Sequence, residues 1–306
     1  METSSFSLTK HVTGICNRMS REHFETLSRE LLETPITNVS MFEQFIYLIV
    51  EKSLRFTHFH DLFADLLYRI QSQSLVWIQT MIQTKHEKGQ WYVFVHSSET
   101  MDKDNSSIPW DGPFSTREDV IVHVSKTTSL KRIVLEHLQS MFHRLSFQMN
   151  EFRTLSLSET TDMNQLRYEQ YKQKWLSVIS LISHLYSLGT MIHRTHISYC
   201  IQSLISPEPM EHNSIPTNDS IMALCKLLLL VGFKYDHETK HDSTIPWSMV
   251  KCLDQVKKWS VMKQELDSRT RFRCLDVLDA SQTKWTLPDM HVDKQSKTEG
   301  MLKQLR

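Results

Sequence analysis

Histidine and cysteine are the residues of this chain that could support metal or redox chemistry. There are sixteen histidines. His58 and His60 are two residues apart and would diverge in direction on a helix, whereas His193 and His196 could share one helix face. No cysteine or carboxylate joins either pair at the spacing of a zinc ligand set. We therefore predict surface or loop histidines and no metal site.

The cysteines do not form a disulfide framework. Their number is odd, no two of them make a CxxC pair, and they are scattered along the chain. This usage favours a reduced, intracellular compartment. The five are Cys16, Cys200, Cys225, Cys252 and Cys274.

Catalytic signatures are absent from the sequence. It contains no GxxxxGK[ST], GxGxxG, GxSxG or HExxH motif, and its six glycines leave little room for phosphate-binding loops. We predict that the chain is not an enzyme and needs no cofactor. The competing hypothesis is an unrecognised histidine-based site, which metal analysis of the purified protein would reveal.

Composition and charge limit the classes of partner. The chain has 306 residues, 40% of them hydrophobic, and a formal net charge of zero. A net charge of zero implies no general electrostatic attraction to nucleic acid or membranes, although a local basic patch is still possible. No apolar run reaches ~18 residues and no signal peptide opens the chain, so we expect a cytoplasmic protein without a membrane or small-molecule partner.

The stretch from Trp175 to Ile205 predicts the architecture. Its first half repeats apolar residues at helical spacing and stops at Gly189, which tolerates the left-handed conformation after a helix. Thr190 is a good N-cap, and a second apolar stripe continues to Ile205. Two amphipathic helices joined by so short a turn are expected to lie antiparallel and to need further pairs beside them. This pattern is typical of an α-solenoid.

Similar stripes run along the rest of the chain. Caps are predicted at Ser20, Ser40, Thr57 and Ser129, and at Asp267 or Ser268. Another helix is predicted to start at Asn218 or Asp219 and to close at Gly232. Residues 1–10 and 289–306 are polar and are expected to be tails. The intervening 11–288 is predicted to be one helical domain.

Residues 85–126 interrupt the helical pattern. Residues 91–97 (WYVFVHS) and 119–125 (DVIVHVS) alternate and are rich in β-branched or aromatic side chains, which indicates strands. Between them lies a polar run with Pro109, Gly112 and Pro113. We expect a non-helical insertion that could carry a β-hairpin.

The last strong helix, residues 269–281, has an unusual face. Thr270, Cys274, Val277 and Leu278 form one stripe, and Phe272 lies nearly opposite it. An aromatic flanked by arginines resembles an interface anchor. The alternative is that Phe272 packs with Leu275 on a second buried face. The flanking arginines are Arg269, Arg271 and Arg273.

Two further surface hypotheses concern this half of the chain. It is locally basic, which fits RNA phosphate or an acidic partner as well as a solvated charged face. The basic residues are Lys257, Lys258, Lys263, Arg269, Arg271 and Arg273, of which the three lysines and Arg273 are the candidates for RNA contact. The segment YCIQSLI at Tyr199 matches the loose pattern of helices that bind cap-binding protein. Because it falls inside the apolar stripe, we interpret it as core.

Several segments together resemble a known family. They are CNRMSREHFETLSRELLETPITN, FIYLIVEKSL, LKRIVLEHLQSMF, SLGTMIHRTHISYCIQSLI, IMALCKLLLLVGFKYD and SRTRFRCLDVLDASQTKW. From about Ile15 to Pro288, and in this order, they resemble the middle domain of eukaryotic translation initiation factor 4 gamma. The last segment is similar to the family's Ser-Arg-Ile-Arg-Phe motif. The resemblance skips 85–126 and 146–174.

The resemblance implies an all-α, HEAT-like α-solenoid of about five helical hairpins with no catalysis of its own. The implied partner is a DEAD-box RNA helicase of the initiation factor 4A type, held by both lobes in a closure-ready geometry; RNA and cap-binding protein are further candidates. The resemblance also favours the partner-facing interpretation of Phe272. The two implied contact sets are Cys16, Met19 and Phe24, and Arg269, Arg271 and Phe272.

The chain departs from the family at two of these positions, at the neighbouring Arg273 and in the insertion. Cys16 and Met19 stand where the family has leucines, and Arg273 where an apolar residue is usual. Several relatives that the resemblance brings in share this domain without being initiation scaffolds. The alternative function is a HEAT-type adaptor in RNA processing, nonsense-mediated decay or cap-binding complexes, without helicase activation.

Overall fold

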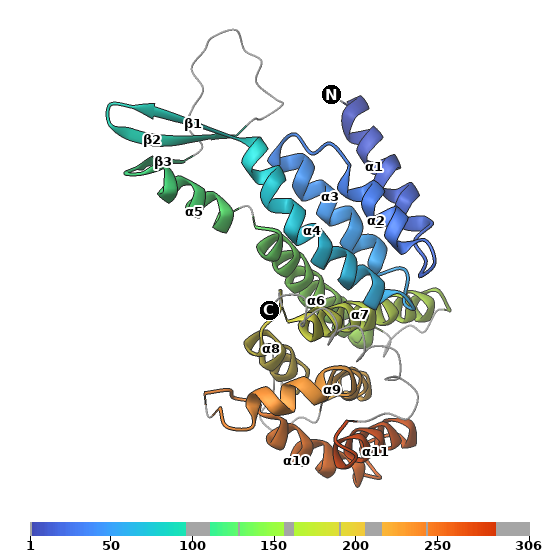
Figure 1. Ribbon diagram of the computed structural model, residues 1–306. Helices are drawn as coiled ribbons and strands as arrows, with labels where there is room; N and C mark the ends of the chain where they lie inside the picture. The colour runs from blue at the N-terminus through green and yellow to red at the C-terminus, as the bar shows by residue number, and fades with distance from the viewer. Residues whose placement is uncertain are drawn as a thin grey trace. The chain divides into compact units, whose positions relative to one another are not determined.

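The computed structural model describes residues 2–95, 111–127, 129–155, 162–189, 191–205, 216–242 and 244–285. Helices dominate these ranges (Figure 1). The chain divides into two compact units, residues 1–191 and 192–306, and each is described by itself below. Among the described residues, none of the helices combines the length and apolar character that crossing a bilayer requires.

Unit 1 is a two-layer stack of helices (Figure 1). Helices α1, α3 and α6 contact one another in succession, and α2, α4 and α7 do the same in the other layer. Phe42 and Phe45 of α3 meet Trp77 of α4 edge to face, with ring centroids 6.1 and 5.5 Å apart. The helices are α1 (Glu2–Asn17), α2 (Phe24–Leu32), α3 (Val39–Ser53), α4 (His60–Met81), α6 (Leu130–Leu155) and α7 (Asp162–Leu188).

Helix α1 corrects the prediction of an N-terminal tail. Residues 2–10 belong to this helix, and Leu8 is buried. Val12 and Ile15 are buried with it, so the three side chains follow the i, i+4, i+7 spacing of one helix face. The sequence therefore contained the signal, which the surrounding serines and threonines obscured. The predicted C-terminal tail, 289–306, lies outside the described residues.

The insertion contains a small antiparallel sheet. Strands β1 (Ile82–Glu87), β2 (Gln90–Val95) and β3 (Asp111–Phe114) follow the order β1-β2-β3, and β1 pairs with β2 as a hairpin. The predicted strand over 91–97 is thus confirmed for 91–95, and its last two residues lie outside the described ranges. The β-hairpin expected in the insertion is present.

The second strand predicted in the insertion is wrong, because 119–125 lies in helix α5 (Arg117–Thr127). Val120 and Val124 are buried while Ile121 and Val122 are about half exposed, so the buried pair is spaced four residues apart, as on a helix. Thr116 caps the helix: its hydroxyl accepts from the backbone N–H of Asp119 at 3.1 Å, and the Asp119 carboxylate accepts from the Thr116 N–H at 3.1 Å.

Unit 2 contains α8 (Arg194–Ile205), α9 (Asn218–Thr239), α10 (Met249–Ser260) and α11 (Ser268–Gln282). Helix α9 contacts the other three, and Tyr235 and Trp259 are fully buried among them. The Tyr235 hydroxyl donates to the Trp247 carbonyl at 2.6 Å. With the three pairs of unit 1, the described helices make five consecutive pairs, if α5 is counted with the insertion.

Helix boundaries follow local capping chemistry. The predicted caps at Ser129 and Asp267 are confirmed by side-chain hydrogen bonds to the third residue ahead. Gly189 has a φ of 82°, the left-handed conformation that was predicted. The other predictions miss the boundary: α2 begins at Phe24 instead of beside Ser20, Asn38 rather than Ser40 caps α3, α4 begins at His60 rather than after Thr57, and α9 continues past Gly232.

Candidate functional site

Helix α11 is anchored by its first residues and by one buried stripe. The Asp267 carboxylate accepts from the Thr270 N–H at 2.6 Å, and this hydrogen bond holds the pKa of Asp267 below its usual value. Thr270, Cys274 and Val277 are completely or almost completely buried against α9 and α10. The stripe fixes the rotation of α11 about its axis and therefore decides which side chains face outward.

Phe272 is the outward-facing aromatic that this rotation produces. It is 64% exposed, and Leu275, one turn further on, is 40% exposed. The prediction that Phe272 lies off the core stripe is confirmed, and the alternative of a second buried face shared with Leu275 is wrong. The two side chains form an apolar pair on an otherwise charged helix surface.

Arginines flank this apolar pair. Arg269 and Arg273 are exposed, and Arg271 is half-buried. The Arg271 Nη2 donates to the Ser268 hydroxyl at 3.0 Å, and the Arg273 Nη1 lies 2.9 Å from the Asp276 carboxylate. Both contacts are local to α11. The Arg273 side chain is at the surface beside Phe272, whereas the Nε of Arg271 is buried.

Lys226 of α9 adds a fourth cation near the same helix. Its side chain is half-buried, and burial together with the nearby charge of Arg273 lowers its pKa. A cation in such surroundings is stabilised by a negative group brought close to it. The surface around the first half of α11 is therefore suited to a partner with an apolar pocket and acidic residues at its rim.

The lysines predicted to contact RNA lie at the end of α10 and just beyond it. Lys257 and Lys258 occupy the last turn of α10, and Lys263 follows in the loop before α11; all three are exposed. Cations in the last turn interact favourably with the helix dipole, so Lys257 and Lys258 also have a local structural role.

The first predicted contact set does not form an exposed patch. Cys16 is 1% exposed, Met19 6% and Phe24 7%. Burial raises the pKa of the Cys16 thiol to about 12. These side chains pack in the core of unit 1, which corrects the expectation that they present a surface to a partner.

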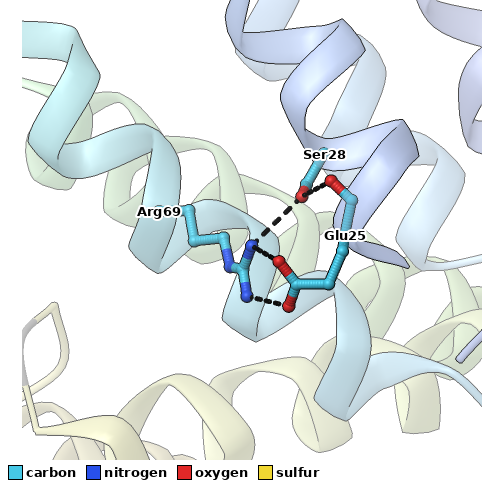
Figure 2. Close-up of polar contacts among 3 residues, drawn as sticks. All are labelled: Glu25, Ser28 and Arg69. Carbon is cyan, nitrogen blue, oxygen red and sulfur yellow. Dashed lines mark hydrogen bonds and ion pairs between the residues drawn. The ribbon is translucent and has the colours of Figure 1, made fainter. Parts of the chain in front are cut away.

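Arg69 of α4 covers the remaining face of Phe24. Its guanidinium carbon lies 4.6 Å from the centre of the Phe24 ring, within cation–π range. As Figure 2 shows, the same guanidinium spans the gap from α4 to α2, bonding both carboxylate oxygens of Glu25 and the hydroxyl of Ser28. The region at Phe24 is therefore a closed helix–helix contact.

The histidines are dispersed. His58 precedes α4 and is exposed, whereas His60 is the first residue of α4 and is buried. The His193 and His196 rings are stacked with centroids 6.0 Å apart, and the His196 Nδ1 accepts from the His193 N–H at 3.1 Å. No group of three metal-ligating side chains occurs in the part of the chain that the structure describes.

The prediction that the segment at Tyr199 is core is confirmed for Cys200, Ile201, Leu204 and Ile205, and is wrong for Tyr199 itself. It is 46% exposed, whereas Leu204 and Ile205 of the same segment are buried. Tyr199 is two residues beyond the buried Ile197, and two residues turn an α-helix by roughly 200°. The apolar residues that a cap-binding-protein helix would present here are packed inside unit 2.

Three surface residues of unit 2 were missed as candidates: Lys226, Leu275 and Phe233, which is 68% exposed on α9. The helical wheel of α11 could have identified Leu275. It lies about 100° from Cys274 on that wheel and therefore off the buried stripe. Phe233 follows a continuous apolar run, so the sequence pattern does not show which side of the helix it occupies. Lys226 is of interest only because Arg273 of a different helix lies near it, and a sequence pattern cannot show this.

Comparison with known proteins gives a consistent family match. The MIF4G domain model matches residues 9–284. Translation initiation factor 4G of Arabidopsis thaliana is 22% identical over 280 residues, which is 90% of this chain and 13% of that protein. Initiation factor 4 gamma 2 of Mus musculus is 21% identical over 303 residues, or 97% of this chain and 28% of that protein.

A solved structure shares the fold. The MIF4G domain of Trypanosoma cruzi translation initiation factor EIF4G5 superimposes with a TM-score of 0.51 and 13% identity, covering 93% of this chain and 99% of that one. The likeness confirms the predicted all-α solenoid. This chain spans less than a third of the two initiation factors compared above, so it corresponds to one region of them.

Proposed function

Because this chain belongs to the MIF4G domain family, we propose that it is a translation-initiation scaffold that binds a DEAD-box RNA helicase of the initiation factor 4A type and promotes its activity. Its relatives by sequence are initiation factors of the 4 gamma type, and the role proposed for this chain is that of a scaffold rather than an enzyme. The site of action would be the cytoplasm.

The exposure of Phe272 is the observation that carries the proposal. Burying an exposed phenylalanine in a partner contributes about 1.5–3 kcal/mol, enough to dominate a small interface. Phe272 sits in the segment SRTRF, which resembles the family's helicase-contact motif, and it is 64% exposed. Arg269 and Arg271 supply the flanking cations of the proposed contact.

The proposed mechanism is one of positioning. A scaffold that holds both helicase lobes raises the effective concentration of each lobe for the other and so speeds ATP-driven closure on RNA. The helicase supplies the ATP chemistry. For one helicase lobe, we propose specific contact residues on α11. For the other lobe we propose none, because Cys16, Met19 and Phe24 are buried.

Replacing Phe272 tests the proposal. We expect Phe272→Ala to weaken binding of the purified helicase by about 2 kcal/mol or more, roughly thirtyfold in Kd, because the anchor ring is lost. Titration calorimetry measures the change, and circular dichroism checks that the helices remain. Unchanged affinity would overturn the assignment of this surface.

Phe233→Ala is the matched control. Cys225 touches Cys274, and Gly232 touches Trp285, so α9 and α11 run parallel and Phe233 is level with the end of α11. That places it about 10 residues, or roughly 15 Å, along the axis from Phe272. The control loses an equally exposed ring, so helicase affinity should not change if the contact is specific.

The adaptor hypothesis makes a different prediction for helicase turnover. A scaffold that promotes closure increases the RNA-dependent ATPase rate of the helicase, and Phe272→Ala reduces the increase. Binding without any stimulation of the ATPase by the wild-type chain would favour an adaptor in RNA processing or decay.

RNA binding is proposed as a secondary activity of the basic residues Lys257, Lys258, Lys263 and Arg273, all of which are exposed. Contacts to phosphates make affinity fall as salt rises, with a slope set by the number of phosphates neutralised. Replacing Lys257 and Lys258 by glutamine should flatten that slope. An unchanged slope would remove these residues from the RNA contact.

A further inference from the structure

Two thiols meet in the core of unit 2. Cys225 of α9 and Cys274 of α11 are both fully buried, and their Sγ atoms are 3.9 Å apart. The residues are 49 positions apart in sequence, so the contact is created by the packing of two helices. Neither thiol takes part in the proposed helicase contact, although Cys274 lies two residues after Phe272.

We propose that Cys225 and Cys274 form an oxidative modification site, at which a small peroxide converts the two thiols into a reversible disulfide between α9 and α11.

The two sulfurs have equivalent roles in the contact. Either thiol can donate the hydrogen bond between them, and burial raises the pKa of both. The charges of Arg273 and Asp276 act on the pair in opposite directions. The thiol that accepts the hydrogen bond is the one that reacts first, since the contact stabilises its thiolate and the thiolate is the nucleophile.

The chemistry balances with hydrogen peroxide as the oxidant. One of the two sulfurs attacks a peroxide oxygen, the O–O bond breaks, and a sulfenic acid and water are formed. The second sulfur then attacks the oxidised sulfur, displacing the hydroxyl group as a second water molecule. The pair loses two electrons and two protons, and one peroxide is reduced to two waters.

The geometry favours this product over other oxidations. A disulfide needs the sulfurs about 2.05 Å apart, so they must approach by roughly 1.9 Å from their present contact, a change that side-chain rotation and a small helix shift can share. All five cysteines are buried, so no exposed thiol competes for the oxidant. A buried pair admits a small peroxide more readily than a bulky glutathione molecule.

The test is peptide mapping of the full chain after mild peroxide treatment under native conditions. We expect an intact mass lower by two hydrogen atoms, a Cys225–Cys274 cross-linked peptide, and reversal of both by dithiothreitol. The oxidised protein should also melt at a higher temperature, because the link closes a long loop.

Matched variants identify the sulfurs. Cys274→Ser should abolish the cross-link, while Cys200→Ser, which removes another buried thiol of unit 2, should leave it intact. Wild-type mapping decides the question even if a variant folds poorly. The proposal is overturned if either thiol instead gains two oxygen atoms as a sulfinic acid, or if the cross-link forms only after urea has unfolded the chain.

Discussion

Glu51 shows how a single side chain can join three helices of unit 1. It projects from α3 towards Lys174 of α7, 3.0 Å away, and His137 of α6, 3.6 Å away. The nearby imidazole of His137, followed by the hydrogen bond with Lys174, lowers the pKa of the Glu51 carboxyl to about 2, against the opposing effect of burial. The carboxylate is thus much more stable in the folded chain than in the unfolded one.

The pH dependence of Glu51 follows from the sign of this shift. Because its folded pKa lies below the unfolded value, the stabilisation is present above about pH 4.5 and is lost as the pH falls towards 2. We expect Glu51→Gln to lower the free energy of unfolding at pH 6 by about 1–2 kcal/mol, allowing for solvent screening. Urea titrations of both proteins should show that the difference in their free energies of unfolding becomes smaller below pH 4.5. A difference that does not change with pH would contradict this role of Glu51.

Phe24 and Phe272 were both predicted to contact a partner, but Phe24 is buried and Phe272 is exposed. Phe24 begins α2 and is covered by the guanidinium of Arg69. Phe272 is held outward because the buried stripe of α11 fixes the rotation of its helix. Exposure was decided by which neighbour packs on each ring, and for Phe24 that neighbour is 45 residues away in sequence.

The N-cap of α11 controls the element that carries the candidate site. Asp267→Ala removes the acceptor for the Thr270 N–H, which should cost about 1 kcal/mol of stability. Asp267→Asn keeps an acceptor and should recover most of the loss. Thermal unfolding measures both, and hydrogen exchange at residues 270–272 should rise in the alanine variant alone. Equal stability of the two variants would show that the cap is not used.

Glycines in two helices give opposite predictions for the same substitution. A Cβ at Gly232 of α9 would lie 2.3 Å from the Trp285 ring, a rigid group that must then move. Gly232→Ala should therefore destabilise unit 2 by about 1–3 kcal/mol. At Gly14 of α1 a Cβ meets nothing within 4 Å. Gly14→Ala should stabilise α1 by up to about 1 kcal/mol, since alanine is the better helix former.

Urea denaturation of the two glycine variants, beside the wild type, is the measurement. A stabilising effect of Gly232→Ala would mean that Trp285 does not pack against α9. A destabilising effect of Gly14→Ala would mean that α1 is not helical at that position.

At the scale of the whole molecule, each unit has a core of its own. In unit 2 the largest buried side chains, Tyr235 and Trp259, lie among α8–α11. A fragment beginning at Ile192 and ending at Arg306 should therefore fold alone, giving a helical circular dichroism spectrum and a cooperative thermal transition. A gradual, non-cooperative melt would show that unit 2 depends on unit 1.

The sequence by itself determined the helical character of the chain and the surface position of Phe272. Both rest on periodicity, because an apolar stripe repeated at helical spacing has to be buried and pushes whatever lies opposite it towards solvent. The resemblance to the initiation factor family was visible for the same reason, since its motifs are the stripes and caps of particular helices.

Only the tertiary structure decided which side chains of unit 1 are accessible and which helices meet. Phe24 is sealed by Arg69, the thiols of Cys225 and Cys274 touch, and Val120 and Val124 are buried as one face of a helix where the local alternation favoured a strand. Each outcome depends on residues distant in sequence or on a surface supplied by another element. The local sequence pattern determines which face of a helix or strand is apolar. The tertiary structure determines which residues of other elements pack against that face.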